Sequence, residues 1–310
     1  MNSALKNYAA YVNNKIDVCE ISLNQYISTD NILQNKQGIE CAASLPIQGG
    51  KVTAFKKGDI LLANIRPYLK KIWYAQFDGG CSADVLAIRA NAKTDSHFLF
   101  YALFRDDFFI HAMKGAKGTK MPRGDKTQIM EFKIPVFDLK TQQSIAAVLS
   151  ALDKKIALNK QINARLEEMA KTLYDYWFVQ FDFPDANGKP YKSSGGDMVF
   201  DETLKREIPK GWGSIELQSC LAKIPNTTKI LNKDIKDFGK YPVVDQSQDF
   251  ICGFTNDEKS ILNPQDAHII FGDHTRIVKL VNFQYARGAD GTQVILSNNE
   301  RMPNYLFYQI

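Results

Sequence analysis

The chain has 310 residues, of which 45% are hydrophobic and 24% charged, and its formal net charge is +5. This length and composition are typical of a globular protein with two domains, and no apolar run reaches the 18 or so residues of a membrane span. The segment Met1–Ala10 lacks a signal-peptide core, and five scattered cysteines match neither a disulfide framework nor a zinc spacing, so a cytoplasmic protein without a metal site is expected.

The first region, residues 1–135, is predicted to mix short strands with helices. Short apolar runs between glycine-containing turns predict strands at Val52–Phe55, Ile60–Leu62 and Val85–Ile88. The aromatic-rich stretch His97–His111 predicts one helix packed on their sheet. Lysine and arginine outnumber acidic residues 18 to 12 in this region, against 15 to 16 in residues 185–310.

Two loops of the first region are strongly basic. Lys51–Lys71 contains six cations and one anion, and Lys114–Lys126 contains five cations and one anion. Lysine suits DNA phosphates, whereas arginine and asparagine suit base edges. Ordinary solvated charge remains the alternative for either loop alone. The candidate DNA-contacting residues are Lys51, Lys56, Lys57, Asn64, Arg66, Tyr68, Lys70, Lys71, Lys117, Thr119, Lys120, Arg123 and Lys126. Among them, Asn64, Arg66, Tyr68 and Arg123 are the expected base-edge readers.

A long helix is predicted from Thr141, its expected N-cap, to Phe178. Its apolar residues recur in alternating steps of four and three, as in a coiled coil, and neither glycine nor proline interrupts them. Asn159 and Asn163 lie within this seam, which favours a coiled coil over a core helix of one domain, because such polar residues fix register and partner number. The helix is therefore expected to need a partner helix. Its expected packing positions are Ile145, Leu149, Leu152, Ile156, Asn159, Asn163, Leu166, Ala170, Leu173 and Trp177.

A turn-rich linker is expected after the helix, followed by a second unit whose core begins at Trp212. The second unit repeats the first in the same order: Ile60–Arg66 matches Ile270–Arg276, Gly80–Val85 matches Ala289–Val294, and Phe98–Tyr101 matches Tyr305–Tyr308. In the second unit, four further candidate DNA-contacting residues lie in or near the stretch that matches the first basic loop. They are His274, Arg276, Lys279 and Arg287. Because only two residues follow Tyr308, the second copy is expected to be truncated.

Catalytic motifs are missing from the sequence. It has no phosphate-binding G-x-x-x-x-G-K-[ST] loop, no G-x-G-x-x-G after a strand and no Asn-Pro-Pro-aromatic box. The four histidines do not have metal-ligand spacing. We therefore expect no catalytic residue, no metal site and no cofactor in this chain.

Four stretches carry a family resemblance over nearly the whole chain. They are Tyr26–Asn31; Gly58–Leu61 with Ile65–Lys71; Ile134–Pro135 through Gln143–Ala146 and Leu152–Ile156; and Trp177–Phe178 with Phe181–Phe183 and Pro209–Trp212. Together they resemble the specificity (S) subunit of type I DNA restriction-modification systems.

The resemblance implies an α+β fold, with two similar mixed α/β target-recognition domains separated by a long coiled-coil-type helix. The expected domains are a first target-recognition domain at 1–138, the spacer helix at 139–182, a linker at 183–207 and an incomplete second recognition domain at 208–310. It also implies that the chain binds a bipartite double-stranded DNA site and directs methyltransferase (M) and restriction (R) subunits to it. Catalysis, S-adenosylmethionine, ATP and Mg²⁺ belong to those partners.

Three alternatives remain open at this stage. The chain could be a half-size subunit that forms a homodimer through its long helix and reads a symmetric site. It could be a coiled-coil scaffold that binds no nucleic acid. It could also be a self-sufficient methyltransferase or nuclease, which the sequence does not favour.

Overall fold

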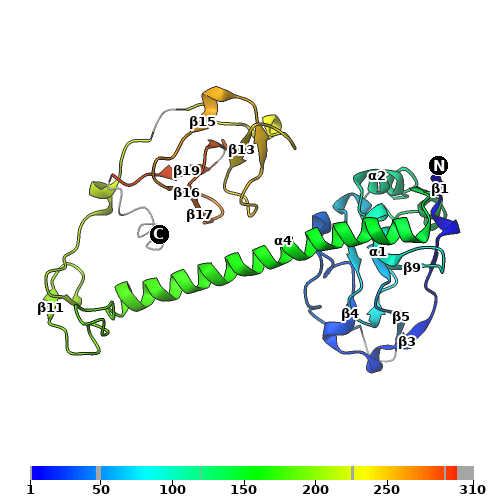
Figure 1. The fold of residues 1–310 in the computed structure, drawn as a ribbon, viewed down its shortest axis with the longest axis horizontal. Helices are drawn as coiled ribbons and strands as arrows, with labels where there is room; N and C mark the ends of the chain where they lie inside the picture. Colours follow the sequence, from blue (N-terminus) through cyan, green and yellow to red (C-terminus); the bar gives the residue numbers. More distant parts are fainter. Residues whose placement is uncertain (1, 47–49, 119, 225–226, 290, 299–310) are drawn as a thin grey trace. The chain divides into compact units, whose positions relative to one another are not determined.

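The computed structural model describes residues 2–46, 50–118, 120–224, 227–289 and 291–298. The chain divides into two compact units, Met1–Gln161 (unit 1) and Ile162–Ile310 (unit 2), and each is described by itself (Figure 1). This division falls within the long helix, so the expected domain boundaries at residues 138, 182 and 207 stay a prediction.

Unit 1 is built on two four-stranded sheets, with strand orders β2-β9-β6-β7 and β3-β5-β8-β4, and a separate pair β1-β10. The strands are β1 Asn2–Ala4, β2 Ala9–Tyr11, β3 Lys15–Asp17, β4 Tyr26–Ile27, β5 Lys51–Phe55, β6 Ile60–Ala63, β7 Ile72–Tyr74, β8 Gly79–Cys81, β9 Val85–Ala90 and β10 Lys133–Pro135. The three strands expected from the sequence are therefore confirmed as β5, β6 and β9.

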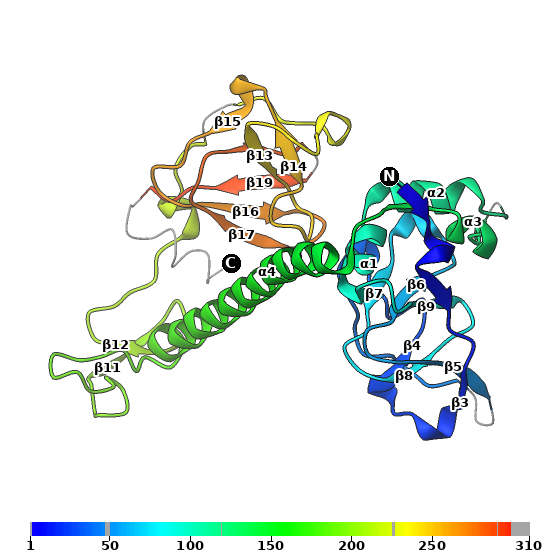
Figure 2. The same cartoon turned by 45° about the vertical axis from the view of Figure 1, so that its right-hand side comes forward.

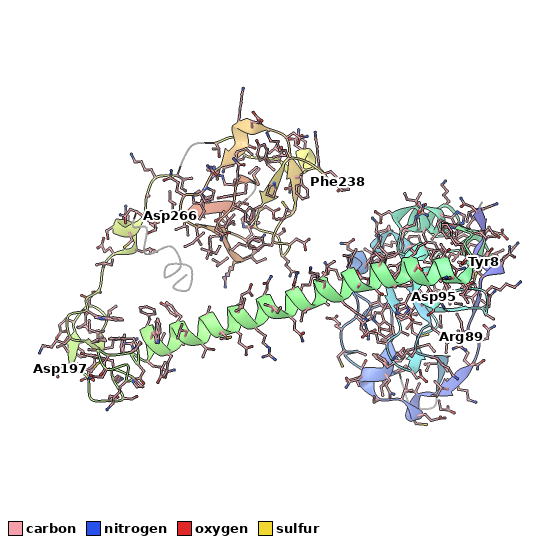
Figure 3. All side chains as sticks on the ribbon, in the orientation of Figure 1. Tyr8, Arg89, Asp95, Asp197, Phe238 and Asp266 are labelled. Atoms are coloured by element: carbon pink, nitrogen blue, oxygen red, sulfur yellow. The ribbon has the colours of Figure 1, made fainter. Side chains whose placement is uncertain are left out.

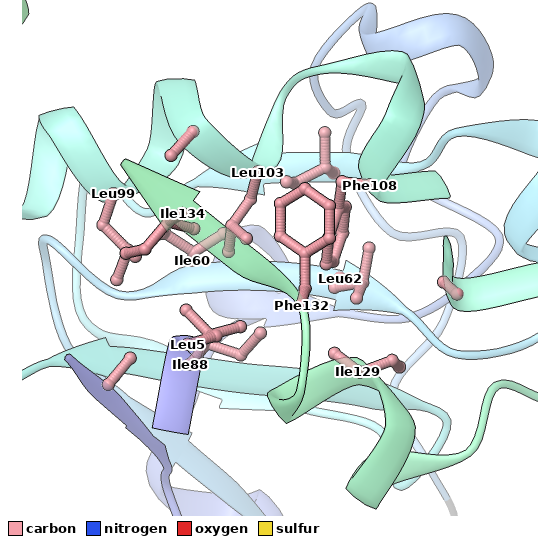
Figure 4. Close-up of a cluster of buried hydrophobic side chains, with 14 of the residues drawn as sticks. Leu5, Ile60, Leu62, Ile88, Leu99, Leu103, Phe108, Ile129, Phe132 and Ile134 are labelled. Atoms are coloured by element: carbon pink, nitrogen blue, oxygen red, sulfur yellow. The ribbon is translucent and has the colours of Figure 1, made fainter. Parts of the chain in front are cut away.

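The aromatic stretch of unit 1 forms two helices, so the prediction of one helix is wrong. They are α1 Ser96–Leu103 and α2 Asp106–Lys114, and the short α3 Lys126–Met130 follows. Arg105 between them is extended, with φ −72° and ψ 149°. In one continuous helix Phe108 would point away from the side that carries Leu99, given 3.6 residues per turn. The break lets both side chains enter the same core (Figure 4).

Unit 1 has two main hydrophobic cores. One lies between the helices and the β2-β9-β6-β7 sheet, and it includes Leu5, Ile60 and Phe132 (Figure 4). The other contains side chains from β4 to β9, among them Leu61, which points to the opposite face of β6 from Ile60. These two cores hold the β6 strand rigidly on both faces.

The long helix α4 spans Leu139–Tyr174 and ends in a π-helical turn at Asp175–Val179. The Asp138 carboxylate accepts the Thr141 N–H at 2.8 Å, so Asp138, and not Thr141, caps the helix. Gln142 is 1% exposed, accepts the Asp95 N–H at 2.9 Å and donates to two backbone carbonyls. Tyr101 of α1 donates to Asp153 at 2.6 Å. The first turns of α4 are thereby fixed to unit 1.

Unit 2 repeats the strand pairing of unit 1. Its strands are β11 Met198–Asp201, β12 Arg206–Pro209, β13 Tyr241–Val244, β14 Gly253–Thr255, β15 Ile261–Leu262, β16 His268–Gly272, β17 Val278–Val281, β18 Tyr285–Arg287 and β19 Thr292–Ile295. β16 pairs with β17 and β19 as β6 pairs with β7 and β9 (Figure 2). β18 is parallel to β13 and antiparallel to β15, as β8 is to β4 and β5.

The inter-strand cores of the two units correspond as well. One inward residue from each of six strands forms the unit 2 core: Val244, Leu262, Ile270, Val281, Tyr285 and Val294. The predicted repeat is thus confirmed at the level of strand pairing, but its first residue match is shifted by one, because Ile270 lies in the inter-strand core as Leu61 does, whereas Ile60 lies in the helix-side core. The second matched segment contains residue 290, which is outside the described ranges. The third segment, at 305–308, lies outside the described residues.

The segment between α4 and the repeat is ordered, although a linker was expected there. β11 and β12 form an antiparallel hairpin inside the range 183–207 and just beyond it. Trp212 stacks on Phe183, with ring centroids 5.1 Å apart, and Phe183 stacks in turn on Tyr191 at 4.8 Å. The prediction that Trp212 opens the core of the second domain is wrong, because its ring belongs to this aromatic cluster at the end of the helix.

Candidate nucleic-acid interface

The two basic loops of unit 1 meet at the hairpin that joins β6 to β7. The Asn64 carbonyl accepts the Gly124 N–H at 3.0 Å, and the Arg66 N–H donates to the Pro122 carbonyl at 2.7 Å. Ile65 lies opposite Arg123 in an isolated antiparallel bridge. Two stretches almost 60 residues apart in sequence therefore form one surface, which we call the hairpin junction (residues 64–68, 117–118 and 120–124).

Arg66 lies at the turn of this junction. Its φ of 52° and ψ of 61° are left-handed, and it directly precedes Pro67, the first residue of the 3-10 turn Pro67–Leu69. Pro67 is buried, whereas Arg66 is exposed. The backbone is thus held in place while the guanidinium remains available to a ligand.

Arg123 lies across the junction from Arg66. Its guanidinium forms an ion pair with Asp84 at 3.0 Å, and both side chains keep substantial exposure. Lys117 pairs with Arg123 through two backbone hydrogen bonds of 2.9 Å, and Lys120 is exposed. Thr119, also expected in this set, lies outside the described residues. An arginine held by one carboxylate has free donors for a second acceptor.

Asn64 is placed differently from the expectation. It is 9% exposed, and its Oδ1 has no hydrogen-bond partner. A side chain on Gly124 would approach that oxygen within 2.8 Å. Burial leaves Asn64 poorly placed to reach a base edge, so the structure favours a role in closing the junction.

Tyr68 and Lys70 line a cleft between the hairpin and α2. Its other walls come from Asp106, Phe109, Ile110, Met113 and Lys114. Tyr68 is 49% exposed. Lys70 and Lys36 both form ion pairs with Asp106, at 3.0 and 2.7 Å. These ion pairs lower the pKa of the Asp106 carboxyl, and Lys36 makes the largest contribution.

The remaining candidate lysines of unit 1 lie outside the hairpin junction. Lys51, Lys56, Lys57 and Lys126 are exposed. Lys71 is half-buried and donates its ammonium to the Thr29 carbonyl at 2.5 Å. Arg89, labelled in Figure 3, binds the buried Asp59 through two hydrogen bonds of 2.7 Å. That bidentate pair fixes the turn between Lys56 and β6, because Asp59 also accepts the Lys56 N–H.

In unit 2 the expected cations separate into exposed and buried groups. His274 and Arg276 are exposed in the hairpin between β16 and β17. Lys279 is 4% exposed, and its ammonium donates to the carbonyls of Asp245 and Asp249 at 2.7 and 2.6 Å. The prediction of a DNA-contacting Lys279 is therefore corrected, since its donors are used inside the fold. Arg287 is half-buried, with an unpaired Nε.

A lysine-containing cleft in unit 2 was missed. Lys229, Lys233 and Lys236 line it together with Asp234 and Asp257. The signal was present in the sequence, where Lys223–Lys240 contains five lysines against two aspartates. Only the overall charge balance of the second region, which is nearly neutral, concealed it.

A metal site is not found in the described parts of the chain. No group of three His, Cys, Asp or Glu residues there could hold a metal ion. All five cysteines are free, and burial raises the pKa of Cys81 to about 12, which disfavours a reactive thiolate. No helix within the described ranges is long and apolar enough to cross a membrane.

The helix seam is uncovered along the middle of α4. Every residue from 151 to 169 is exposed, and Leu152, Ile156 and Leu166 are 54–56% exposed. Asn159 and Asn163 lie within this exposed range, Leu173 is exposed, and Ile145, Leu149 and Trp177 are partly buried near the ends. The apolar seam, interrupted by Asn159 and Asn163, is therefore exposed to solvent along the middle of the helix.

Comparisons with known proteins agree on one family. The family model for the "Type I restriction modification DNA specificity domain" matches residues 6–168. The HindI specificity subunit of Haemophilus influenzae is 34% identical over 168 residues, which are 51% of this chain and 36% of that protein. The EcoDI specificity subunit of Escherichia coli is 32% identical over 123 residues, 38% of this chain and 27% of that protein. The matched part thus spans about a third or less of these curated relatives.

One solved structure supports the fold. The S subunit of a type I restriction-modification system from M. genitalium superposes with a TM-score of 0.52, over 99% of this chain and 75% of that chain, at 15% identity. At this identity the match concerns the architecture of two sheet-containing domains and a helix.

Proposed function

This chain belongs to the type I restriction modification DNA specificity family, and on that premise we propose that it recognises DNA sequence for a type I restriction-modification complex. In this proposal the chain directs methyltransferase and restriction subunits to its site in the cytoplasm. It catalyses no reaction itself. S-adenosylmethionine, ATP and Mg²⁺ act on the partner subunits.

The hairpin junction is the observation that carries the proposal. Two basic loops, separate in sequence, are joined there by backbone hydrogen bonds of 2.7–3.0 Å. Surface cations that interact only with solvent would not require loops that are held together by backbone hydrogen bonds. A preorganised basic surface loses little conformational entropy when it binds a duplex.

Different residues of this surface are assigned different roles. Lys51, Lys56, Lys57, Lys117, Lys120 and Lys126 are proposed to contact phosphates, since exposed ammonium groups supply affinity without sequence information. Arg66, Tyr68 and Arg123 are proposed to contact base edges. Asn64 is proposed to hold the two loops together from beneath.

Binding-site selection from a randomised duplex library tests the proposal. The full chain is expected to enrich a defined sequence and to bind it with a marked salt dependence. Arg66→Ala is then expected to cost roughly 1–3 kcal/mol on the selected site and to relax preference at one base pair. An equal loss on selected and scrambled duplexes would show that Arg66 does not discriminate bases, and no enrichment by the native chain would contradict the function itself.

The long helix is proposed to set the distance between two recognised half-sites. Residues 151–169 of α4 carry no bend-inducing proline or glycine. Insertion of about four helical residues after Gln161 is expected to lengthen the spacer of the selected site. An unchanged spacer would remove this role from the helix while leaving recognition intact.

The exposed seam is proposed to bind helices of the methyltransferase subunits. A second candidate, a homodimer, is favoured by one specific feature of the sequence. In an antiparallel pair centred on Gln161, Asn159 meets Asn163, and Lys154 and Lys155 meet Glu168 and Glu167. Such polar and charged pairs fix register in helix pairs.

The mass of the purified full chain in solution separates these candidates. A monomer supports cover by methyltransferase subunits, whereas a dimer supports the symmetric-site alternative. The charge reversal Lys154→Glu/Lys155→Glu should dissociate an antiparallel dimer, and Glu167→Lys/Glu168→Lys in the same chain should restore it. A scaffold without nucleic-acid function would instead show no salt-dependent retention on DNA.

A further inference from the structure

Two arginines lie in the corresponding hairpins of the two repeated units. Arg66 lies in the hairpin between β6 and β7, and Arg276 lies in the hairpin between β16 and β17. β6 and β16 are matched by their pairing with two antiparallel neighbours each. The two hairpins therefore project from equivalent positions of the fold.

Both arginines have a left-handed backbone. Their φ angles are 52° and 57°, in a chain where only seven non-glycine residues within the described ranges have positive φ. Arginine is disfavoured in this region relative to glycine, because its Cβ approaches the following carbonyl. Both hairpins thus have arginine where glycine would be the less strained residue.

The two backbones are held by different contacts. The Arg66 N–H donates to the Pro122 carbonyl of the second basic loop at 2.7 Å, whereas the Arg276 N–H donates to Gly272 within its own hairpin at 2.9 Å. The Thr275 hydroxyl also donates to the Gln246 carbonyl at 2.8 Å. The common outcome, a left-handed arginine, therefore does not follow from one shared local contact.

Both guanidinium groups are free for a ligand. Each arginine is exposed, and among the residues that the structure describes neither side chain has a hydrogen-bond or ion-pair partner. By contrast, the left-handed Lys205 in the β11–β12 hairpin forms an ion pair with Glu202 at 2.8 Å. A strained residue with an unused side chain points to function rather than to stability.

We propose that Arg66 and Arg276 are a matched pair of specificity-determining residues, one in each unit, whose left-handed backbones aim their guanidinium groups at DNA base edges. The inference rests on the proposed DNA recognition and adds that unit 2 contributes a base contact of its own. Each fork of donors suits the O6 and N7 acceptors of guanine. Glycine would relieve the backbone strain at these positions, but it has no side chain that could contact a base.

Glycine variants separate this proposal from a structural role. Arg66→Gly and Arg276→Gly relieve the backbone strain, whereas Arg66→Ala and Arg276→Ala keep it, and all four remove the guanidinium. The folding equilibrium constant of each glycine variant is expected to exceed that of its alanine counterpart by roughly threefold or more, measured by denaturant unfolding of the full chain. Lys205→Gly is the matched control for strain relief at a left-handed residue outside the proposed interface.

DNA binding by the same variants gives the second readout, on the duplex selected by the native chain and on a scrambled duplex. Both arginine-to-glycine variants are expected to lose roughly 5- to 100-fold in preference for the selected duplex, and Lys205→Gly should keep the native preference. Glycine variants that unfold more readily than the alanine variants would overturn the strain argument.

Retained preference in Arg276→Gly, with loss in Arg66→Gly, would overturn the matched pair while leaving the proposed function in place. Absence of any preference in the native chain would overturn both. The whole 310-residue chain is used throughout, so no result depends on an isolated unit.

Discussion

Units 1 and 2 have the same strand pairing, but the hydrophobic cores described for them differ. In unit 1 the inter-strand core faces one side of β6, and a second core under α1, α2 and α3 covers the other side (Figure 4). In unit 2 the matching core has six buried residues, and a small neighbouring cluster contains Ile230, Val243 and Ala286. Backbone pairing and inward-pointing residues of the strands are therefore what the described parts of the two units share.

The loops, unlike the strands, differ between the two units. In unit 1 the β6–β7 hairpin is supported by a second basic loop, while in unit 2 the β16–β17 hairpin is supported by Gln246. Lys117 and Lys120 beside the first hairpin are exposed, whereas Lys279 beside the second is buried. The comparison teaches that the frame fixes where an arginine is presented, while loop residues determine what surrounds it.

Truncating a buried core residue in either unit should have the largest effect on stability. Leu61 and Ile270 are both fully buried and occupy equivalent positions in the two inter-strand cores. Leu61→Ala and Ile270→Ala are each expected to cost about 2–5 kcal/mol, because each leaves a cavity between packed strands. Denaturant unfolding followed by hydrogen exchange should show the loss in the mutated unit. Equal loss of protection in both units would indicate that they do not fold separately.

Truncation of Lys279 should sharpen the contrast between buried and exposed cations. Lys279→Ala leaves the carbonyls of Asp245 and Asp249 without their buried donor, for an expected cost of about 1–3 kcal/mol. The matched control, Lys57→Ala, removes an exposed side chain and should change stability by less than about 0.5 kcal/mol. Thermal unfolding compares the two. A Lys279→Ala protein as stable as the control would show that these hydrogen bonds contribute nothing.

Much of this contrast could be predicted from the sequence, because it depends on regular patterns. The α4 periodicity, the strands β5, β6 and β9, and the repeat were all visible as apolar spacing. The break at Arg105 was not, because one aromatic run can fit one helix or two until its core is known. Asp138 was missed as the cap because Thr141, three residues later, is an equally good capping type.

The candidate interface was only partly predictable. Charge counts indicated both basic loops, but nothing local to either loop indicates that Arg66 would bond to Pro122. Burial of Asn64 and Lys279 depends on partners distant in sequence, and a lysine next to apolar residues has the same pattern whether its ammonium points out or in. Left-handed arginines have no sequence signature, since glycine is the residue that usually marks such positions.

Lys57 should separate affinity from sequence preference at the unit 1 surface. Lys57→Ala is expected to weaken binding to all duplexes alike and to reduce the slope of log K against log salt by about 1. Titrations at several salt concentrations measure both quantities. A change in preference between duplexes, with an unchanged slope, would assign Lys57 to base contact instead.

The smallest expected effect concerns the ion pairs that Asp106 forms with Lys36 and Lys70 beside the β6–β7 hairpin. Lys36 and then Lys70 lower the pKa of this carboxyl. Its contribution to stability is therefore present above its unfolded pKa of about 3.9 and is lost as pH falls through the lower folded value. Because the pair is exposed, the effect should stay below about 1 kcal/mol. In Asp106→Asn this part of the acid dependence should be missing; an unchanged acid profile would show that the ion pairs are not formed in solution.

The central claim is that two equivalent hairpins each contribute an arginine that reads its own part of one DNA site. Binding-site selection with the native chain, Arg66→Lys and Arg276→Lys tests it most directly, because lysine keeps the charge and loses the bidentate fork. We expect each variant to retain binding but to lose base preference at one separate group of positions. Identical selected sequences for all three proteins would contradict the claim.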